Sequence, residues 1–313
     1  MSKIPVWIDT GSSADDAFAL LAAIYLEREG LLEIRGVSAV CGNAEMDKAF
    51  ENARDVLYLA GREDIPVFPG AKKPLLVELS KASCVHGEDG PGGARLTASP
   101  ALREDMPAWD ALYLCARECA GELELILLGP ETNAAIALRK FPELPKYLKR
   151  ILIKGGSEVW GNQTPAAEYN IWADPHGAQV VFKSGIPIVM CGLDLTTHAQ
   201  LMAEEIHEIV SCDSRGCSLF RESTDFAKEA CSLSGSEGFF VHGACPVLYA
   251  AYPEMFQGDP SGVFVETRGR ITRGKTVCDR VTDIKFGIRN AIVVRGTDRA
   301  WFSRVIVSAL KAV

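Results

Sequence analysis

The sequence lacks long apolar stretches and any excess of positive charge. No uninterrupted apolar run approaches the roughly 20 residues that a membrane-spanning helix needs. The chain has 33 lysine and arginine residues against 41 aspartate and glutamate residues, and the net charge of −8 creates no basic field for phosphate backbones or anionic lipids. The opening residues MSKIPVWIDTG lack the apolar segment of a secretory signal and the pattern of a transit peptide. We expect a cytoplasmic protein that binds neither nucleic acid nor a membrane.

The ten cysteines lack the spacing of a metal site or a disulfide framework. The closest pairs, Cys115 with Cys119 and Cys212 with Cys217, form no C-x-x-C motif and have no histidine in zinc-finger register. Cysteine without such a role behaves as a small buried residue. We therefore expect reduced, mostly buried thiols.

Short apolar runs typical of strands alternate with helical patterns. Residues 4–8 (IPVWI) predict a buried strand, and the segment from Ala14 to Gly30 has apolar residues at helical spacing. The same patterns predict strands at 34–40, 123–128, 151–153 and 186–190, and helices at 45–60, 109–120, 133–139 and 176–183. The polar helical region 203–236 is expected to cap a sheet edge. Without a linker or repeat, we predict one α/β domain over residues 1–313, an open, mainly parallel twisted sheet flanked by helices.

Polar clusters follow several of these strands, where ligands bind to sheets of this kind. Asp9, Asp15 and Asp16 surround a turn that leads from the first strand into a helix. Asp15 and Asp16 could be ordinary first-turn charges, with Ser12 or Ser13 as the helix cap. Three carboxylates at the end of one strand are better explained by a site for hydroxyl groups or a hard cation.

Two further clusters are less specific. Asn162, Glu168 and Asn170 lie in the Gly-rich segment 155–175, where their side chains could hydrogen-bond sugar hydroxyls or simply stabilise turns. His242 precedes an apolar helical run in VHGACP, and a lone histidine there is more often structural than catalytic. These residues alone leave both alternatives open.

Eight motifs occur in the order and at the spacings of one enzyme family. They are IDTGSSADDA, VCGN, HGEDG, LLGPETNAA, the GN…P…AEYN…DP segment, GLDLTTHA, VHGACP and RGRITRGKTVCDR. Together they resemble the inosine-uridine preferring nucleoside hydrolases from the first strand to about residue 280. The resemblance implies a homodimer or homotetramer that hydrolyses the N-glycosidic bond of ribonucleosides to ribose and free base, in purine or pyrimidine salvage.

The resemblance also implies roles for individual residues. The ribose-binding positions of the family fall on Asp15, Asn43, Asn162, Glu168 and Asn170. His242 matches a histidine that some members use near the leaving base, and Tyr169 lies where an aromatic residue is usual. The family binds calcium, and its recognisable ligands here are Asp16 and the carbonyl of Leu128. Contacts to the base are expected from loops around HGEDGPGG and residues 220–242.

The chain departs from the family pattern at two calcium ligands. The aspartate that serves as general base is replaced by Gly11, and a second calcium aspartate is replaced by Gly243. Calcium takes six to eight oxygen ligands, so the remnant site looks incomplete and no cofactor is expected. Three hypotheses follow: a hydrolase in which Asp9 or Asp15 assists water, a metal-free protein that binds ribose or a nucleoside, and a structural subunit of an active relative.

Overall fold

The computed structural model describes residues 3–80, 92–101, 103–196, 198–223, 238–280 and 287–313. The HGEDG motif at 86–90 and much of the 220–242 loop lie outside these ranges, so the expected base contacts are not described. Within the described residues, no helix combines the length and apolar character required to cross a bilayer. The eight described cysteines are free thiols, and only four of them are buried whereas the other four are partly buried.

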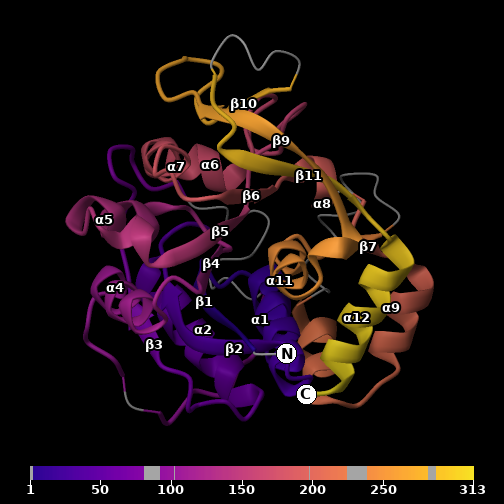
Figure 1. Cartoon of the computed structure of the whole chain (residues 1–313). Helices are drawn as coiled ribbons and strands as arrows, with labels where there is room; N and C mark the ends of the chain where they lie inside the picture. Colours follow the sequence, from indigo (N-terminus) through magenta and orange to yellow (C-terminus); the bar gives the residue numbers. More distant parts are fainter. Residues whose placement is uncertain (1–2, 81–91, 102, 197, 224–237, 281–286) are drawn as a thin grey trace.

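A nine-stranded mixed sheet forms the centre of the molecule (Figure 1). From one edge to the other, its strands are β10 (Thr276–Asp279), β9 (Phe256–Val265), β11 (Ala291–Thr297), β6 (Ile188–Cys191), β5 (Leu148–Lys154), β4 (Leu123–Leu127), β1 (Ile4–Thr10), β2 (Leu32–Ala39) and β3 (Val67–Pro69). Neighbouring strands from β3 to β11 pair in parallel, whereas β9 pairs antiparallel with both β11 and β10. The mainly parallel sheet predicted from the sequence is confirmed.

Helices cover both faces of this sheet. Those on one face are α1 (Ala14–Arg28), α2 (Met46–Leu59), α11 (Ala244–Ala251) and α12 (Arg299–Lys311), with α9 (Ala203–Val210) packed outside α12. Those on the other face are α4 (Ala108–Glu118), α5 (Thr132–Lys140) and α7 (Pro175–Phe182). The short elements are α6 (Tyr169–Ala173), α8 (Leu193–Thr196), β7 (Gln200–Leu201), β8 (Phe239–Phe240) and the 3₁₀ turns Leu144–Lys146 and Pro253–Met255. Two separate apolar cores therefore lie above and below the strands.

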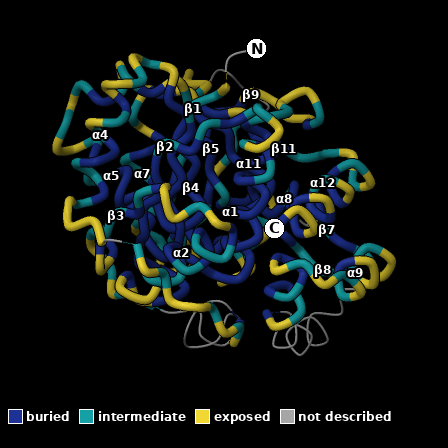
Figure 2. The backbone as a smooth tube through the Cα atoms, turned by 90° about the horizontal axis from the view of Figure 1, so that it is seen from below, coloured by how far each residue is buried: buried dark blue, intermediate teal, exposed yellow. Residues whose placement is uncertain are grey.

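The central elements are buried almost completely, as Figure 2 shows for the β1, β4 and α1 region. Helix α1 is apolar on nearly all sides because it packs against α2, α11 and α12 as well as the sheet. Such all-round burial is typical of a helix inside a large domain. The α1 N-terminus, which carries the paired aspartates, is thus fixed at the edge formed by the carboxyl ends of β1 and its neighbours.

Two expectations need correction. The sequence patterns did not predict β9, β10 and β11. Strand β9 was missed because residues 257–260 are exposed and it pairs antiparallel at the sheet margin. The described part of the 203–236 region does not cap a sheet edge, because α9 packs on α12 within the helical layer. A polar helix sequence reveals one exposed face but does not reveal which element its apolar face contacts.

Candidate functional site

The turns after β1, β2 and β4 meet closely at the carboxyl edge of the sheet. The Leu128 amide donates to the Asp9 carbonyl over 2.8 Å, which joins the ends of β4 and β1. A Cβ on Gly129 would lie 2.9 Å from the Gly11 nitrogen, and a Cβ on Gly42 would lie 2.9 Å from Pro130 Cδ. Glycine is required at 129 and 42 for this approach, which brings the predicted polar clusters together.

Asp16 completes the N-terminal cap of α1. Ser13 is the N-cap residue, its Oγ accepts from the Asp16 amide over 3.3 Å, and its own amide donates to Asp16 Oδ2 over 3.3 Å. Thr10 Oγ1 donates to the same Asp16 oxygen over 3.2 Å. The capping alternative considered from the sequence is therefore correct for Asp16. Its Oδ1 is buried and has no hydrogen-bond partner among the described residues.

Asp15 faces the segment that precedes α11. The Gly243 amide donates to Asp15 Oδ2 over 3.0 Å, and Lys154 Nζ lies 3.8 Å from that oxygen. Burial raises the pKa of Asp15 to about 7, although the Lys154 ammonium acts in the opposite direction. Asp15 Oδ1 is buried, and no donor reaches it from the part of the chain that the structure describes. This carboxyl group therefore titrates near neutrality and has one open acceptor oxygen, as a general base requires.

Asp9 lies deeper, between β2 and α5. Its Oδ2 accepts from Ser38 Oγ over 2.5 Å and from Asn133 Nδ2 over 2.7 Å. Burial raises the pKa of Asp9 to about 7, against the effect of these two donors. Asn133 also donates to the Ala39 carbonyl and accepts from the Ala71 amide. Asp9 thus holds the ends of neighbouring elements together, whereas Asp15 faces Lys154 and Gly243.

Glu168 and Asn170 are positioned by the start of α6. Glu168 is the N-cap residue, and its Oε2 accepts from the amides of Ile171 and Gly156 over 3.2 and 3.1 Å. Burial raises the pKa of Glu168, while Lys154 and these amides lower it. Asn170 Nδ2 donates to the carbonyls of Leu128 and Lys154 over 2.8 Å each. The two side chains are therefore fixed beside the ends of β4 and β5.

The remaining predicted residues lie at the margin of this cluster. Asn162 is exposed, and its Oδ1 accepts from the Tyr169 amide over 2.9 Å, so it supports the loop before α6. Asn43 is 4% exposed after β2, and its buried Oδ1 has no hydrogen-bond partner within the described ranges. His242 precedes Gly243, and its ring stacks on Phe240 with a centroid distance of 5.3 Å.

Two charged residues of the cluster were missed by the sequence reasoning. Lys154 ends β5 with a side chain that is only 12% exposed, and it influences the titration of Asp15, Asp16 and Glu168. Glu131 is fully buried after β4, and neither of its carboxylate oxygens accepts a hydrogen bond from another described residue. Burial raises the pKa of Glu131 well above its ordinary value. The sequence signal that could have identified Lys154 and Glu131 is a charged residue at or shortly after the end of an apolar strand.

Several buried oxygen atoms of the cluster therefore lack donors among the residues that the structure describes. They are Asp15 Oδ1, Asp16 Oδ1, Asn43 Oδ1, Asn170 Oδ1 and both carboxylate oxygens of Glu131. Native proteins pair the large majority of buried polar atoms, so a group of unpaired acceptors at one sheet edge indicates a ligand that supplies donors. The arrangement suits hydroxyl groups, which donate one hydrogen bond each.

The donor set does not suit calcium. Gly11 and Gly243 provide no carboxylate, Asp16 Oδ2 already accepts from Thr10 and Ser13, and Asp16 Oδ1 with one lone pair of the Leu128 carbonyl is what remains of the family ligands. Among the described residues, no three His, Cys, Asp or Glu side chains form a group that could hold a metal ion. Calcium needs six to eight oxygen ligands and a high carboxylate count for tight binding. A lysine ammonium beside Asp15 further opposes a second cation.

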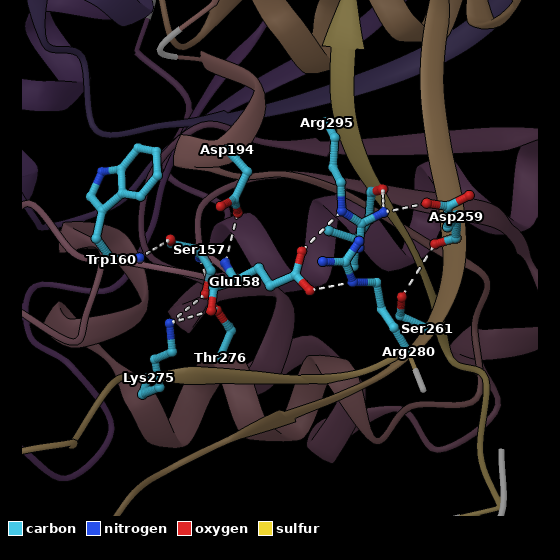
Figure 3. A network of polar contacts seen from close by, with 11 residues as sticks. Ser157, Glu158, Trp160, Asp194, Asp259, Ser261, Lys275, Thr276, Arg280 and Arg295 are labelled. Carbon is cyan, nitrogen blue, oxygen red and sulfur yellow. Dashed lines mark hydrogen bonds and ion pairs between the residues drawn. The ribbon is translucent and has the colours of Figure 1, made fainter. Parts of the chain in front are cut away.

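A separate network of polar contacts fixes the loop after β5 (Figure 3). Glu158 forms ion pairs with Arg295, at 2.9 Å, and with Arg280. Its amide donates to Asp194 Oδ2 over 2.6 Å. Lys275 Nζ donates to the carbonyls of Ser157 and Glu158 over 3.0 and 2.8 Å. The motifs GLDLTTHA and RGRITRGKTVCDR thus position the loop that leads to Asn162.

Comparisons with known proteins agree with this geometry. The family model of the inosine-uridine preferring nucleoside hydrolases matches residues 6–304. The chain is 36% identical over 312 residues to a pyrimidine-specific ribonucleoside hydrolase RihA of Shigella boydii, covering 98% of each protein. Its structure is similar to a plant nucleoside hydrolase, PpNRh1, with a TM-score of 0.92, 29% identity and full coverage of both chains. It is also similar to a purine-preferring ribonucleoside hydrolase from Gardnerella vaginalis, with a TM-score of 0.91, 26% identity and 98% coverage of each chain. The chain therefore belongs to the inosine-uridine preferring nucleoside hydrolase family.

Proposed function

We propose that this protein hydrolyses the N-glycosidic bond of a ribonucleoside and that it does so without calcium. The observation that supports this most directly is the group of buried acceptor oxygens on Asp15, Asp16, Asn43 and Asn170, which have no donors among the described residues. A ribose ring presents several hydroxyl donors on a small apolar frame, which matches a set of fixed oxygens at one sheet edge. The reaction class is inferred from family membership. The absence of calcium is inferred from Gly11 and Gly243, which replace two calcium-binding aspartates of the family.

Asp15 is the proposed general base. The reaction breaks the bond between C1′ and the base nitrogen and forms a bond from C1′ to a water oxygen. Asp15 Oδ1 accepts the water proton, because the pKa of Asp15 is about 7 and this oxygen has no other donor within the described residues. The Gly243 amide holds the other oxygen at 3.0 Å and fixes the carboxylate plane.

Glu168 and Asn170 are the proposed ribose-holding residues. Both are oriented by backbone groups, Glu168 through the amides of Gly156 and Ile171 and Asn170 through two carbonyls. Such preorganised groups stabilise a transition state without reorienting during the reaction. His242 is the proposed proton donor to the departing base. It occupies the position of a histidine that some family members use near the base, and it directly precedes Gly243, whose amide donates to Asp15.

Release of free base from uridine and inosine by the purified protein tests this function. Uridine is chosen because the RihA relatives are named pyrimidine-specific, and inosine because of the family name. We expect turnover of at least one substrate and the loss of that turnover in Glu168→Ala. The control variant is Lys149→Met, which changes an exposed lysine on the same strand as Lys154 and should leave the melting temperature unchanged. Absence of turnover and of nucleoside binding by the unmodified protein would reject the proposal.

A further inference from the structure

Lys154 lies buried among the carboxylates of the site. It is the last residue of β5, and side chains alternate between the two faces of a strand. Leu152, two residues earlier, belongs to the core beneath α1, so Lys154 shares that face. Its Nζ lies 3.8 Å from Asp15 Oδ2, which is an ion pair and not a hydrogen bond. The ammonium is therefore directed toward Asp15 without being fixed to that carboxylate by a hydrogen bond.

The charges around Lys154 favour its ionised form. Burial lowers the pKa of Lys154, but the carboxylates of Asp16, Asp15, Glu168 and Glu131 outweigh burial and raise it above its ordinary value. In return, Lys154 lowers the pKa of Asp15, Asp16 and Glu168 against the effect of their burial. One ammonium thus acts on carboxylates from three separate parts of the chain.

Two glycines face the same carboxylate. A Cβ on Gly11 would lie 3.5 Å from Asp16 Oδ2, and a Cβ on Gly243 would lie 3.5 Å from Asp16 Oδ1. The backbone therefore still surrounds Asp16 as it would in a cage of aspartates. A divalent cation with two additional aspartates carries no net charge, and two glycines with one ammonium carry a single positive charge. The two arrangements differ by one unit of charge, but both place a cation beside the paired aspartates.

We propose that the Lys154 ammonium is the resident cation of this site, where it takes the place of a metal ion and binds the hydroxyl oxygens of the ligand together with Asp15 and Glu168. An ammonium offers three N–H donors and a fixed charge, which suit hydroxyl oxygens. It requires no ion from solution. Lys154 is thus a substrate-positioning residue, and the site binds its ligand equally well in chelator and in calcium.

The acidic groups around Lys154 also influence which class of ligand binds. This inference rests on the proposed function, which identifies the sugar as ribose. Asp15, Asp16, Glu168 and Glu131 bring four carboxyl groups to the site, against one ammonium. A phosphate group would meet like charges at short range. We therefore expect an uncharged N-riboside to bind more tightly than its phosphate ester.

Calorimetric titration with calcium tests the position of the cation. The unmodified protein and the Gly11→Asp, Gly243→Asp double variant should bind no calcium. The triple variant that adds Lys154→Met should bind it, and a calcium concentration a hundredfold above its Kd should raise the melting temperature by about 5 °C. A Cβ at 243 would lie 3.1 Å from the Ala19 Cβ, so the single Gly11→Asp change with Lys154→Met is the alternative if the triple variant does not fold. Calcium binding by the unmodified protein, or equal affinity in the double and triple variants, would overturn the proposal.

Titration with uridine in the presence of a chelator tests whether Lys154 positions the ligand. Lys154→Met should weaken binding at least tenfold, Lys154→Arg should restore part of it, and the strand control Lys149→Met should not change it. Uridine 5′-phosphate should bind at least tenfold more weakly than uridine to the unmodified protein. If Lys154→Met binds uridine normally, Lys154 does not position the ligand. If the unmodified protein binds no riboside, the proposed function fails while the calcium titration still decides the position of the cation.

Discussion

Two polar clusters extend from the same end of β5, and they are built in opposite ways. In the outer cluster, Glu158 is paired with both Arg280 and Arg295, and Arg295 also pairs with Asp259 at 2.7 Å (Figure 3). In the inner cluster, four buried carboxylates surround Lys154, and several of their oxygens have no donor among the described residues. The outer cluster is organised to hold a loop, whereas the inner one leaves buried oxygens without donors from the described residues, at a cost in stability.

The largest expected effect is the loss of activity in Asp15→Asn. The amide keeps an acceptor for the Gly243 amide but cannot take a proton from water. We expect kcat/KM for uridine to fall by about 10²–10⁴-fold. The free energy of unfolding at pH 8 should fall by no more than about 1 kcal/mol, because a buried charge is removed at the same time. An activity within threefold of the unmodified protein would show that another group is the base.

The next effect is the pH dependence of stability. The pKa of Asp9 is about 7 in the folded protein and 3.8 in an unfolded chain, so the folded state binds more protons between these values. The contribution of Asp9 is therefore complete below pH 3.8 and is lost as the pH rises through 7. The free energy of unfolding should therefore decline less between pH 3.8 and pH 7 in Asp9→Asn than in the unmodified protein, with a difference of up to about 4 kcal/mol. Urea unfolding at a series of pH values measures it, and parallel curves for the two proteins would contradict the assignment.

A smaller effect is expected in the outer cluster. Arg295→Ala leaves Glu158 with Arg280 as its remaining paired arginine and frees Asp259. We expect a loss of about 2 kcal/mol in stability and a rise of a few fold in KM, with kcat little changed, because the loop before Asn162 is loosened. Steady-state kinetics and thermal unfolding check this. A loss confined to kcat would mean that the network takes part in the chemical step.

The smallest effect is expected for Lys149→Met. Lys149 is exposed on β5 and forms ion pairs with Glu122 at 3.4 Å and with the buried Glu124 at 3.8 Å, and Glu124 keeps a closer ion pair with Arg150 at 2.9 Å. Exposed pairs contribute about 0–1 kcal/mol, so stability and uridine affinity should both remain nearly unchanged. Comparison with Lys154→Met on the same strand then separates the effect of position from that of removing a lysine. An equal loss of uridine affinity in Lys149→Met and Lys154→Met would show that the position of Lys154 inside the inner cluster has no special effect.

Much of the fold was predictable because the central strands are continuous apolar runs. Residues 4–8 form such a run, residues 123–128 are apolar except for Glu124, and both segments are buried parallel strands. Strand β9 was missed because its polar first half shows no such pattern. Oligomeric state, location and the single-domain organisation stay predictions.

The candidate site was predictable in its membership but not in its electrostatics. Asp15, Glu168 and Asn170 were predicted from family positions, and the structure brings them to one sheet edge. Lys154 reads in sequence as the polar end of a strand, and its approach to Asp15 depends on the tertiary packing that places the N-terminus of α1 beside the end of β5. The roles of all these residues remain proposals until the variants are measured.

The most direct measurement is the initial rate of free-base release from uridine by the unmodified protein, in chelator and in millimolar calcium. A site whose cation is Lys154 predicts the same rate in both conditions and a loss of that rate in Lys154→Met. A rate that is abolished by chelator and restored by calcium would contradict a metal-free site, and would mean that Gly11 and Gly243 leave enough oxygen ligands for the metal.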